Sequence, residues 1–273
     1  MSLLRRTLSV VLVSLPLVLP AAAQDQEPER IPFADGELTI TETPDFEKVL
    51  AFDGRELARD YFAFFERIAD VGGTDVAFFY IGPGGNACAP SVGMVWKPED
   101  GDVTLEMTAA DCMTPPPAIS ELAVFFIPQL LPGTVADVTR WAPGEGFGLQ
   151  GRIVYAPQPG TSWSTFDAAS IGHPLDIFRN ADIHAAAEDL LGDGMGTVAA
   201  GLGTAGEPEI ASDGKLVARG CVPHACGISD SVVVVDPEEQ TIYFAQKEDD
   251  RTRYWPDLAE WPEAVSALVP SDF

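Results

Sequence analysis

The sequence predicts an α+β fold built from two disulfide-bonded domains that follow a secretory leader. Apolar runs with strand composition alternate with turns rich in glycine and proline, and two segments show helical spacing. The four cysteines form two close pairs, Cys88 with Cys112 and Cys221 with Cys226. After PQPGTSW the composition becomes less regular. We therefore place the domain boundary near residues 165–172, which gives domains of 24–168 and 169–273.

The first 23 residues have the three parts of a secretory signal peptide. MSLLRR is basic, LSVVLVSLPLVLP is apolar, and three alanines precede Gln24. The apolar run is too short to cross a bilayer core of about 30 Å. We therefore expect residues 1–23 to be cleaved and the mature protein to be periplasmic or secreted, where disulfides form and persist.

The chain is strongly acidic, with 16 Lys and Arg against 42 Asp and Glu and a net charge of -26. Cleavage of the leader removes Arg5 and Arg6, which leaves 14 basic residues and a net charge of -28. Such a surface repels nucleic acid and anionic lipid, and it attracts basic partners. The alternative is a surface that serves solubility alone.

The first domain is predicted to be α+β. A helix is expected to begin at Asp53 and to end before Gly72 and Gly73. Its buried face is expected to hold five apolar residues at helical spacing, namely Leu57, Tyr61, Phe64, Phe65 and Ile68. Strands are predicted over residues 76–81, 92–96, 103–107 and 152–155.

Cys88 and Cys112 bracket two of these strands. A bridge between them would close a loop of 25 residues. In the entropic model that closure constrains the unfolded chain by roughly 3.5 kcal/mol. We therefore expect this pair to be a structural staple of the first domain.

The second domain is predicted to be an antiparallel sheet with helices at its ends. A helix is expected over residues 182–191, and strands over 215–219, 232–235 and 242–246. The sequence DPEEQ supplies turn residues between the last two strands. Gly201, Gly203 and Gly206 fit the pattern of a dinucleotide-binding turn, but EPEIASDG follows where the phosphate-binding helix should start. We therefore expect no cofactor.

The sequence points to no catalytic site. It contains no Walker loop, H-E-x-x-H or G-x-S-x-G motif, and His173, His184 and His224 are its only histidines. A three-histidine zinc site would need all of them, so we expect no metal. We predict that the protein is not an enzyme. An unrecognised enzyme in the first domain, and an envelope binding or structural protein, remain as alternatives.

The stretch GCVPHACG, residues 220–227, is the most specific feature. A bridge from Cys221 to Cys226 would enclose six residues and contribute only about 2 kcal/mol to global stability, so its use must be local. Pro223 fixes one backbone angle, and the small ring presents His224 at a rigid tip. Rigidity lowers the entropy cost of inserting the tip into a cleft, and an imidazole suits an acidic site. The alternative is a tight structural turn with an incidental histidine.

The sequence ARGCVPHACGISDSVVVVDPEEQTIYFAQ resembles the signature region of the inhibitor of vertebrate lysozyme family, periplasmic proteins of Gram-negative bacteria. The family hallmark is a C-x-P-H-x-C loop followed by glycine. The sequence matches it at Cys221, Pro223, His224, Cys226 and Gly227. The resemblance runs from about Asp182 to the C-terminal tail and does not cover the first domain.

The resemblance implies an inhibitor with an antiparallel sheet, a packed helix and a histidine loop. The loop would enter the cleft of a c-type lysozyme, commonly a basic protein, and His224 would meet its two catalytic carboxylates. The implied target-binding loop comprises Val222, Pro223, His224, Ala225 and Gly227. Lysine and aspartate are usual in the family where Val222 and Ala225 stand here, so a related muramidase is a possible target.

Overall fold

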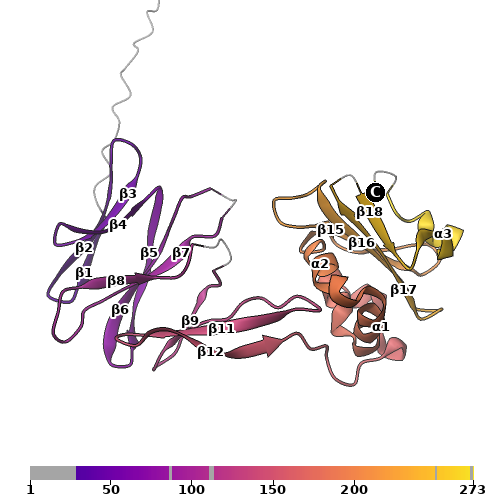
Figure 1. Ribbon diagram of the computed structural model, residues 1–273, viewed down its shortest axis with the longest axis horizontal. Helices are drawn as coiled ribbons and strands as arrows, with labels where there is room; N and C mark the ends of the chain where they lie inside the picture. Colours follow the sequence, from indigo (N-terminus) through magenta and orange to yellow (C-terminus); the bar gives the residue numbers. More distant parts are fainter. Residues whose placement is uncertain (1–28, 86–87, 111–113, 250, 271–272) are drawn as a thin grey trace, which may run out of the picture.

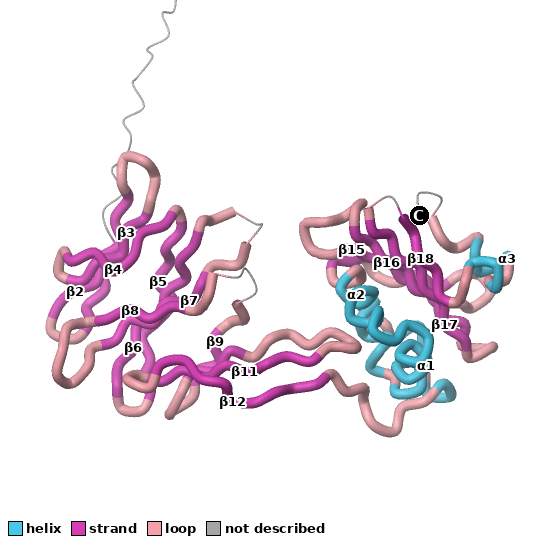
Figure 2. Tube along the Cα trace, in the orientation of Figure 1, coloured by secondary structure: helices cyan, strands magenta, loops and turns pink. Residues whose placement is uncertain are grey.

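The computed structural model describes residues 29–85, 88–110, 114–249, 251–270 and 273. The predicted signal peptide and Cys112 lie outside the described residues. The leader and the pairing of Cys88 with Cys112 therefore stay predictions. In the described residues the chain forms two bodies joined by a long strand pair, and antiparallel sheets dominate both of them (Figures 1 and 2).

The first body, residues 29–154, consists of three four-stranded antiparallel sheets. The first sheet contains β1 (Glu29–Phe33), β2 (Gly36–Glu42), β3 (Lys48–Phe52) and β4 (Arg55–Asp60). The second contains β5 (Phe62–Val71), β6 (Thr74–Gly82), β7 (Ser91–Trp96) and β8 (Thr104–Met107). The third has the order β12-β11-β10-β9, and its strands are β9 (Pro117–Ile119), β10 (Val124–Phe126), β11 (Val135–Ala142) and β12 (Gly146–Val154).

The second sheet is the middle layer of the first body. Successive residues of β6 face opposite sides of the sheet, and both sides are buried. Phe79 shares a buried cluster with Leu38 and Leu50 of the first sheet. Phe78 shares another with Trp141 of the third sheet. Because both faces are covered, β6 is a continuous apolar run, which is why a strand could be predicted over residues 76–81.

The helix predicted from Asp53 is wrong, because the segment forms β4 and β5. A β-bulge between Phe65 and Arg67 accounts for the error. Phe65 pairs with Phe79 and Ile68 pairs with Ala77, so two residues three apart on β5 face partners two apart on β6. That spacing of three imitates the period of a helix.

The expected core face of that helix is also largely wrong. Tyr61, Phe64 and Ile68 are exposed, Tyr61 by 60% and Phe64 by 53%, whereas Leu57 and Phe65 are partly buried against the cluster between the first two sheets. β5 is the last strand of its sheet, so its outer backbone edge pairs with no other described strand. The described residues up to Val154 contain no helix, and the α+β prediction for the first domain is therefore corrected to an all-β arrangement.

The second body, residues 155–273, contains the helices and a six-stranded antiparallel sheet. The sheet has the order β13-β15-β16-β17-β18, with β14 also paired to β15. Its strands are β13 (Thr204–Ala205), β14 (Glu209–Ile210), β15 (Leu216–Cys221), β16 (Ser229–Asp236), β17 (Thr241–Glu248) and β18 (Arg251–Trp255). The α-helices are α1 (Ala181–Leu191), α2 (Met195–Ala200) and α3 (Glu263–Ser266). The 3-10 turns are η1 (Trp163–Thr165), η2 (Ala168–Ser170), η3 (Pro174–Arg179), η4 (Gly192–Gly194) and η5 (Leu258–Glu260).

The predicted elements of the second domain are present. The helix predicted over residues 182–191 is α1, and its N-cap is Asn180, whose side chain accepts hydrogen bonds from the amides of Asp182 and Ile183. The three predicted strands are β15, β16 and β17. Since sheets outweigh helices along the chain, the whole protein is mainly β, and the α+β description fits its second body.

Both faces of the second sheet are covered. Val233 and Phe244 belong to a buried cluster with Ile183 of α1 on one face. On the other face, Val234 clusters with Trp261 near the C-terminal end of the chain. Among the described helices, none is long and apolar enough to cross a membrane.

The open end of the β11–β12 pair, where β11 begins and β12 ends, reaches the second body (Figure 1). Gly133 lies against α2 so closely that an added Cβ would be 2.8 Å from the Cβ of Met195. Tyr155 follows β12, and its ring stacks on that of His184 of α1, with centroids 5.3 Å apart. These contacts join the two bodies at the helical face of the second sheet.

Candidate functional site

The candidate site is the loop that joins β15 to β16. Cys221 ends β15, and its disulfide to Cys226 spans a Cα distance of 4.9 Å, so this predicted bridge is present. The strand register pairs Cys221 with Asp230. Beyond this pair, residues 223–224 and 226–228 form turns.

Hydrogen bonds of ordinary length hold the backbone of this loop. The amide of Val222 donates to the carbonyl of Ser229 at 2.9 Å, and the amides of Ala225 and Ser229 donate to the carbonyls of Val222 and Ala225, each also at 2.9 Å. The amide of Gly227 donates to the Oδ1 of Asp230 at 2.8 Å. The bridge and these bonds leave the loop little conformational freedom.

His224 occupies the exposed tip of the loop. Its φ of 66° lies in the left-handed region, which is uncommon for residues other than glycine. Pro223 and Gly227 are exposed as well, whereas Val222 and Ala225 are half-buried. Within the described part of the chain, the imidazole of His224 makes no hydrogen bond. The five residues expected to bind a target thus lie on one rigid loop, and their role in binding stays a prediction.

Sequence reasoning missed two features beside the loop. Ile228 is 56% exposed although it sits in a turn, where a β-branched apolar residue is unusual. An isoleucine within a turn was the sequence signal that could have revealed this exposed side chain. A cavity of about 420 Å³ also borders the disulfide, and Arg219, Asp230 and Phe273 line it.

The other two histidines have structural surroundings. The Nδ1 of His173 accepts a hydrogen bond from the amide of Leu175 at the start of η3. His184 is only 9% exposed, and burial lowers its pKa, an effect that the nearby carboxylate of Glu188 opposes. In the described residues, no three His, Cys, Asp or Glu side chains form a group that could hold a metal ion.

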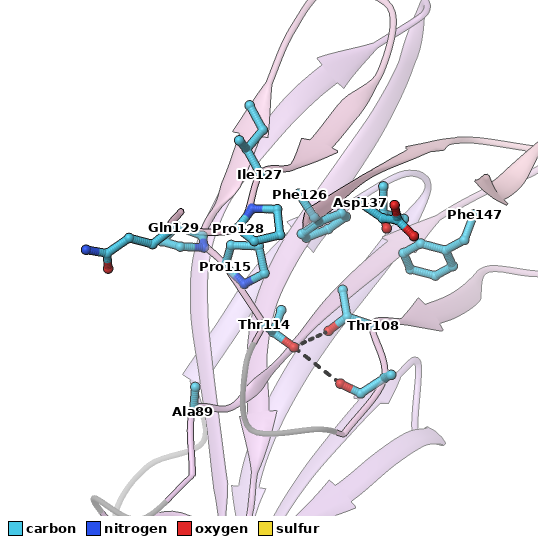
Figure 3. A pocket seen from close by; sticks show the side chains of 13 residues that line it. Ala89, Thr108, Thr114, Pro115, Phe126, Ile127, Pro128, Gln129, Asp137 and Phe147 are labelled. Atoms are coloured by element: carbon cyan, nitrogen blue, oxygen red, sulfur yellow. Dashed lines mark hydrogen bonds between the residues drawn. The ribbon is translucent and has the colours of Figure 1, made fainter. Parts of the chain in front are cut away.

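The first body has a larger cavity, of about 860 Å³ (Figure 3). Phe126, Phe147 and three prolines give it an apolar lining. Asp137 is the one titratable side chain among the described lining residues, and the Nε of Arg152 donates to its Oδ1 at 2.8 Å. The cavity therefore offers a binding surface but no pair of nucleophile and base.

The comparisons with known proteins fall on the same two parts of the chain. Residues 34–154 match the family model described as the Y4bG N-terminal domain, and residues 182–271 match that of the inhibitor of vertebrate lysozyme (Ivy). One relative, "Uncharacterized protein y4bG" of Sinorhizobium fredii, is 26% identical over 218 residues, which cover 80% of this chain and 80% of the relative. No solved structure matches.

The match over residues 182–271 confirms the resemblance that the disulfide loop indicated, and it confines that resemblance to the C-terminal part of the chain. Ivy is a family of inhibitors and not of enzymes. The chain is therefore similar, in this order, to the Y4bG N-terminal domain over residues 34–154 and to the lysozyme inhibitor family Ivy over residues 182–271.

Proposed function

We propose that the protein is an exported inhibitor of a basic c-type lysozyme or a related muramidase, and that it acts by inserting His224 into the enzyme's acidic cleft. The observation that carries this proposal is an exposed histidine at the tip of a disulfide-closed loop, within the part of the chain that matches Ivy. The signal-like leader supports a periplasmic or secreted location.

The chemistry of the target explains why a histidine suits this role. Glycosidases of this kind use a carboxylic acid and a carboxylate held in different protonation states. An imidazole can donate one hydrogen bond and accept another, or donate two when it is protonated. A histidine bonded to both groups would exclude the substrate and disturb their acid and base roles. The inhibitor itself would perform no chemistry.

The charge of the protein supports a basic target. Opposite net charges increase the rate at which two proteins meet, more than they increase the final affinity. The loop lacks the two flanking charges that are usual in the family, since Val222 and Ala225 stand at those positions. Which muramidase is bound must then depend on other residues around the loop.

A second candidate function concerns the first body. Its cavity of about 860 Å³ has the size and the mostly apolar lining of small-molecule sites. This supports an envelope binding role for the Y4bG N-terminal domain, alongside inhibition by the second body.

The test is an inhibition assay against a panel that includes a basic c-type lysozyme and other muramidases. Against the most sensitive enzyme, His224→Ala should weaken binding about thirtyfold, since truncation of a central interface residue often costs about 2 kcal/mol. Gln240→Ala is the matched control, because Gln240 is also exposed, has a φ of 52° and lies at the opposite end of β16. Equal inhibition by the wild type and His224→Ala would refute the histidine mechanism.

A further inference from the structure

Ile228 is held at the loop by its backbone while its side chain meets solvent. Its amide donates to the carbonyl of Ala225 at 3.1 Å, and its carbonyl accepts from the amide of Asp249 at 2.9 Å. The side chain is nevertheless 56% exposed. A residue fixed in this way offers its apolar surface to a partner with little further loss of backbone entropy.

Single exposed apolar residues are common on protein surfaces, so exposure alone would mean little. Ile228 is unusual because the neighbouring apolar residues are buried, as apolar side chains usually are. The next apolar residues along the chain, Val232 to Val235, are all buried in the sheet. Glycine, proline and small polar residues are the usual choice in turns, and an exposed isoleucine there contributes nothing to the core. Departures of this kind are expected at functional sites.

Pro223 adds a second exposed apolar side chain to the same loop. It directly precedes His224, and the amide of Val222 before it donates to the carbonyl of Ser229, the residue after Ile228. Gly227, which follows the disulfide, is exposed and adds no side chain to the loop. Next to Ile228, the exposed residues Glu248 and Asp249 lie at the end of β17 and directly after it. The histidine tip therefore has an apolar flank and then an acidic border.

We propose that Pro223 and Ile228 form an apolar shoulder that packs against an apolar rim of the target's cleft when His224 enters it. The shoulder would be the specificity-determining surface of a loop that lacks the usual flanking charges. A protein interface commonly has such an apolar centre within a polar border. The partner that fits is a basic enzyme with an apolar patch at the mouth of its cleft. This inference rests on the proposed function.

The test compares isoleucine truncations at two sites of similar exposure. Ile228→Ala should raise the inhibition constant for a sensitive basic c-type lysozyme about tenfold, and Ile228→Val about threefold, in proportion to the apolar surface lost. Most of the change should lie in the dissociation rate. Ile210→Ala is the control, because Ile210 is 51% exposed and pairs with Leu216 at the end of β15 remote from the loop. It should change the constant less than twofold, and thermal unfolding should show that all three variants fold.

The outcomes separate this inference from the function on which it rests. If His224→Ala abolishes inhibition while Ile228→Ala behaves like Ile210→Ala, the shoulder is refuted and the histidine mechanism stands. If the wild type inhibits no muramidase of the panel, the proposed function is refuted and the shoulder with it. A graded loss from Ile228 through valine to alanine, with an unaffected Ile210→Ala, supports the shoulder.

Discussion

Two histidines of this chain show how surroundings decide the role of one residue type. His224 could be singled out from sequence because Cys221, Pro223 and Cys226 are its near neighbours, so the signal is local. His184 could be assigned to a helix, but its stacking partner Tyr155 lies 29 positions away, directly after β12. Contacts of that range have no sequence signal in a single chain.

The buried histidine should make stability depend on pH. Burial lowers the pKa of His184 below the ordinary histidine value of 6.5, although Glu188 on the same helix partly opposes this. The unfolded state then binds more protons, so the stability that neutral His184 provides is complete above about pH 6.5 and is lost as the pH falls through the folded pKa. The other charged groups near the Tyr155 ring are Asp176 and Arg179.

His184→Phe keeps an aromatic ring against Tyr155 and removes the titration. Urea unfolding at about pH 7 and about pH 5 should show the wild type losing more stability than the variant on acidification. Parallel losses in the two proteins would mean that His184 contributes nothing to the pH dependence.

At the scale of elements, the sequence predicts those strands and helices that a local pattern of residues specifies. Buried strands with continuous apolar runs, such as β6 and β7, and a helix with a capping residue, α1, could be predicted. No strand of the first sheet is predicted, although Leu38 and Ile40 alternate with the polar residues Glu37, Thr39 and Thr41 as a half-buried strand requires. β5 was misassigned because its bulge depends on pairing with β6, which no local pattern records.

The contact between the β11–β12 pair and α2 should be sensitive to a single methyl group. Gly133→Ala would place a Cβ 2.8 Å from that of Met195 at a φ of 74°. Gly160→Ala is a matched control, since its φ is 75° and nothing lies within 4 Å of the added carbon. We expect the control to lose about 1 kcal/mol from left-handed strain, and Gly133→Ala to lose roughly 1 to 3 kcal/mol more from overpacking. Equal losses of unfolding free energy in the two variants would show that the contact between the bodies can adjust to the extra methyl group without a measurable cost.

At the scale of the molecule, residues before the predicted boundary contribute to the second core. Tyr155, Trp163 and Phe166 pack against the cluster that contains α1. A fragment of residues 155–273 should therefore be more stable than a fragment of residues 169–273, because the shorter one loses this apolar burial.

Both fragments contain the disulfide loop, so both should inhibit a sensitive lysozyme as well as the full chain does. Urea unfolding and inhibition assays on the two fragments check this prediction. A folded 155–273 fragment that is inactive, beside an active full chain, would mean that the first body contributes to the binding surface.

The exposed edge strand β5 bears on the colloidal behaviour of the protein. An unpaired edge with Tyr61 and Phe64 in solvent is a template on which a second copy could add its own strand. Mutual repulsion between molecules with a net charge of -26 opposes that encounter at neutral pH. The repulsion vanishes near the isoelectric point of about 4.1, and high salt screens it. The acidic composition therefore opposes association of copies of this chain through β5 at neutral pH, and acidification weakens that opposition.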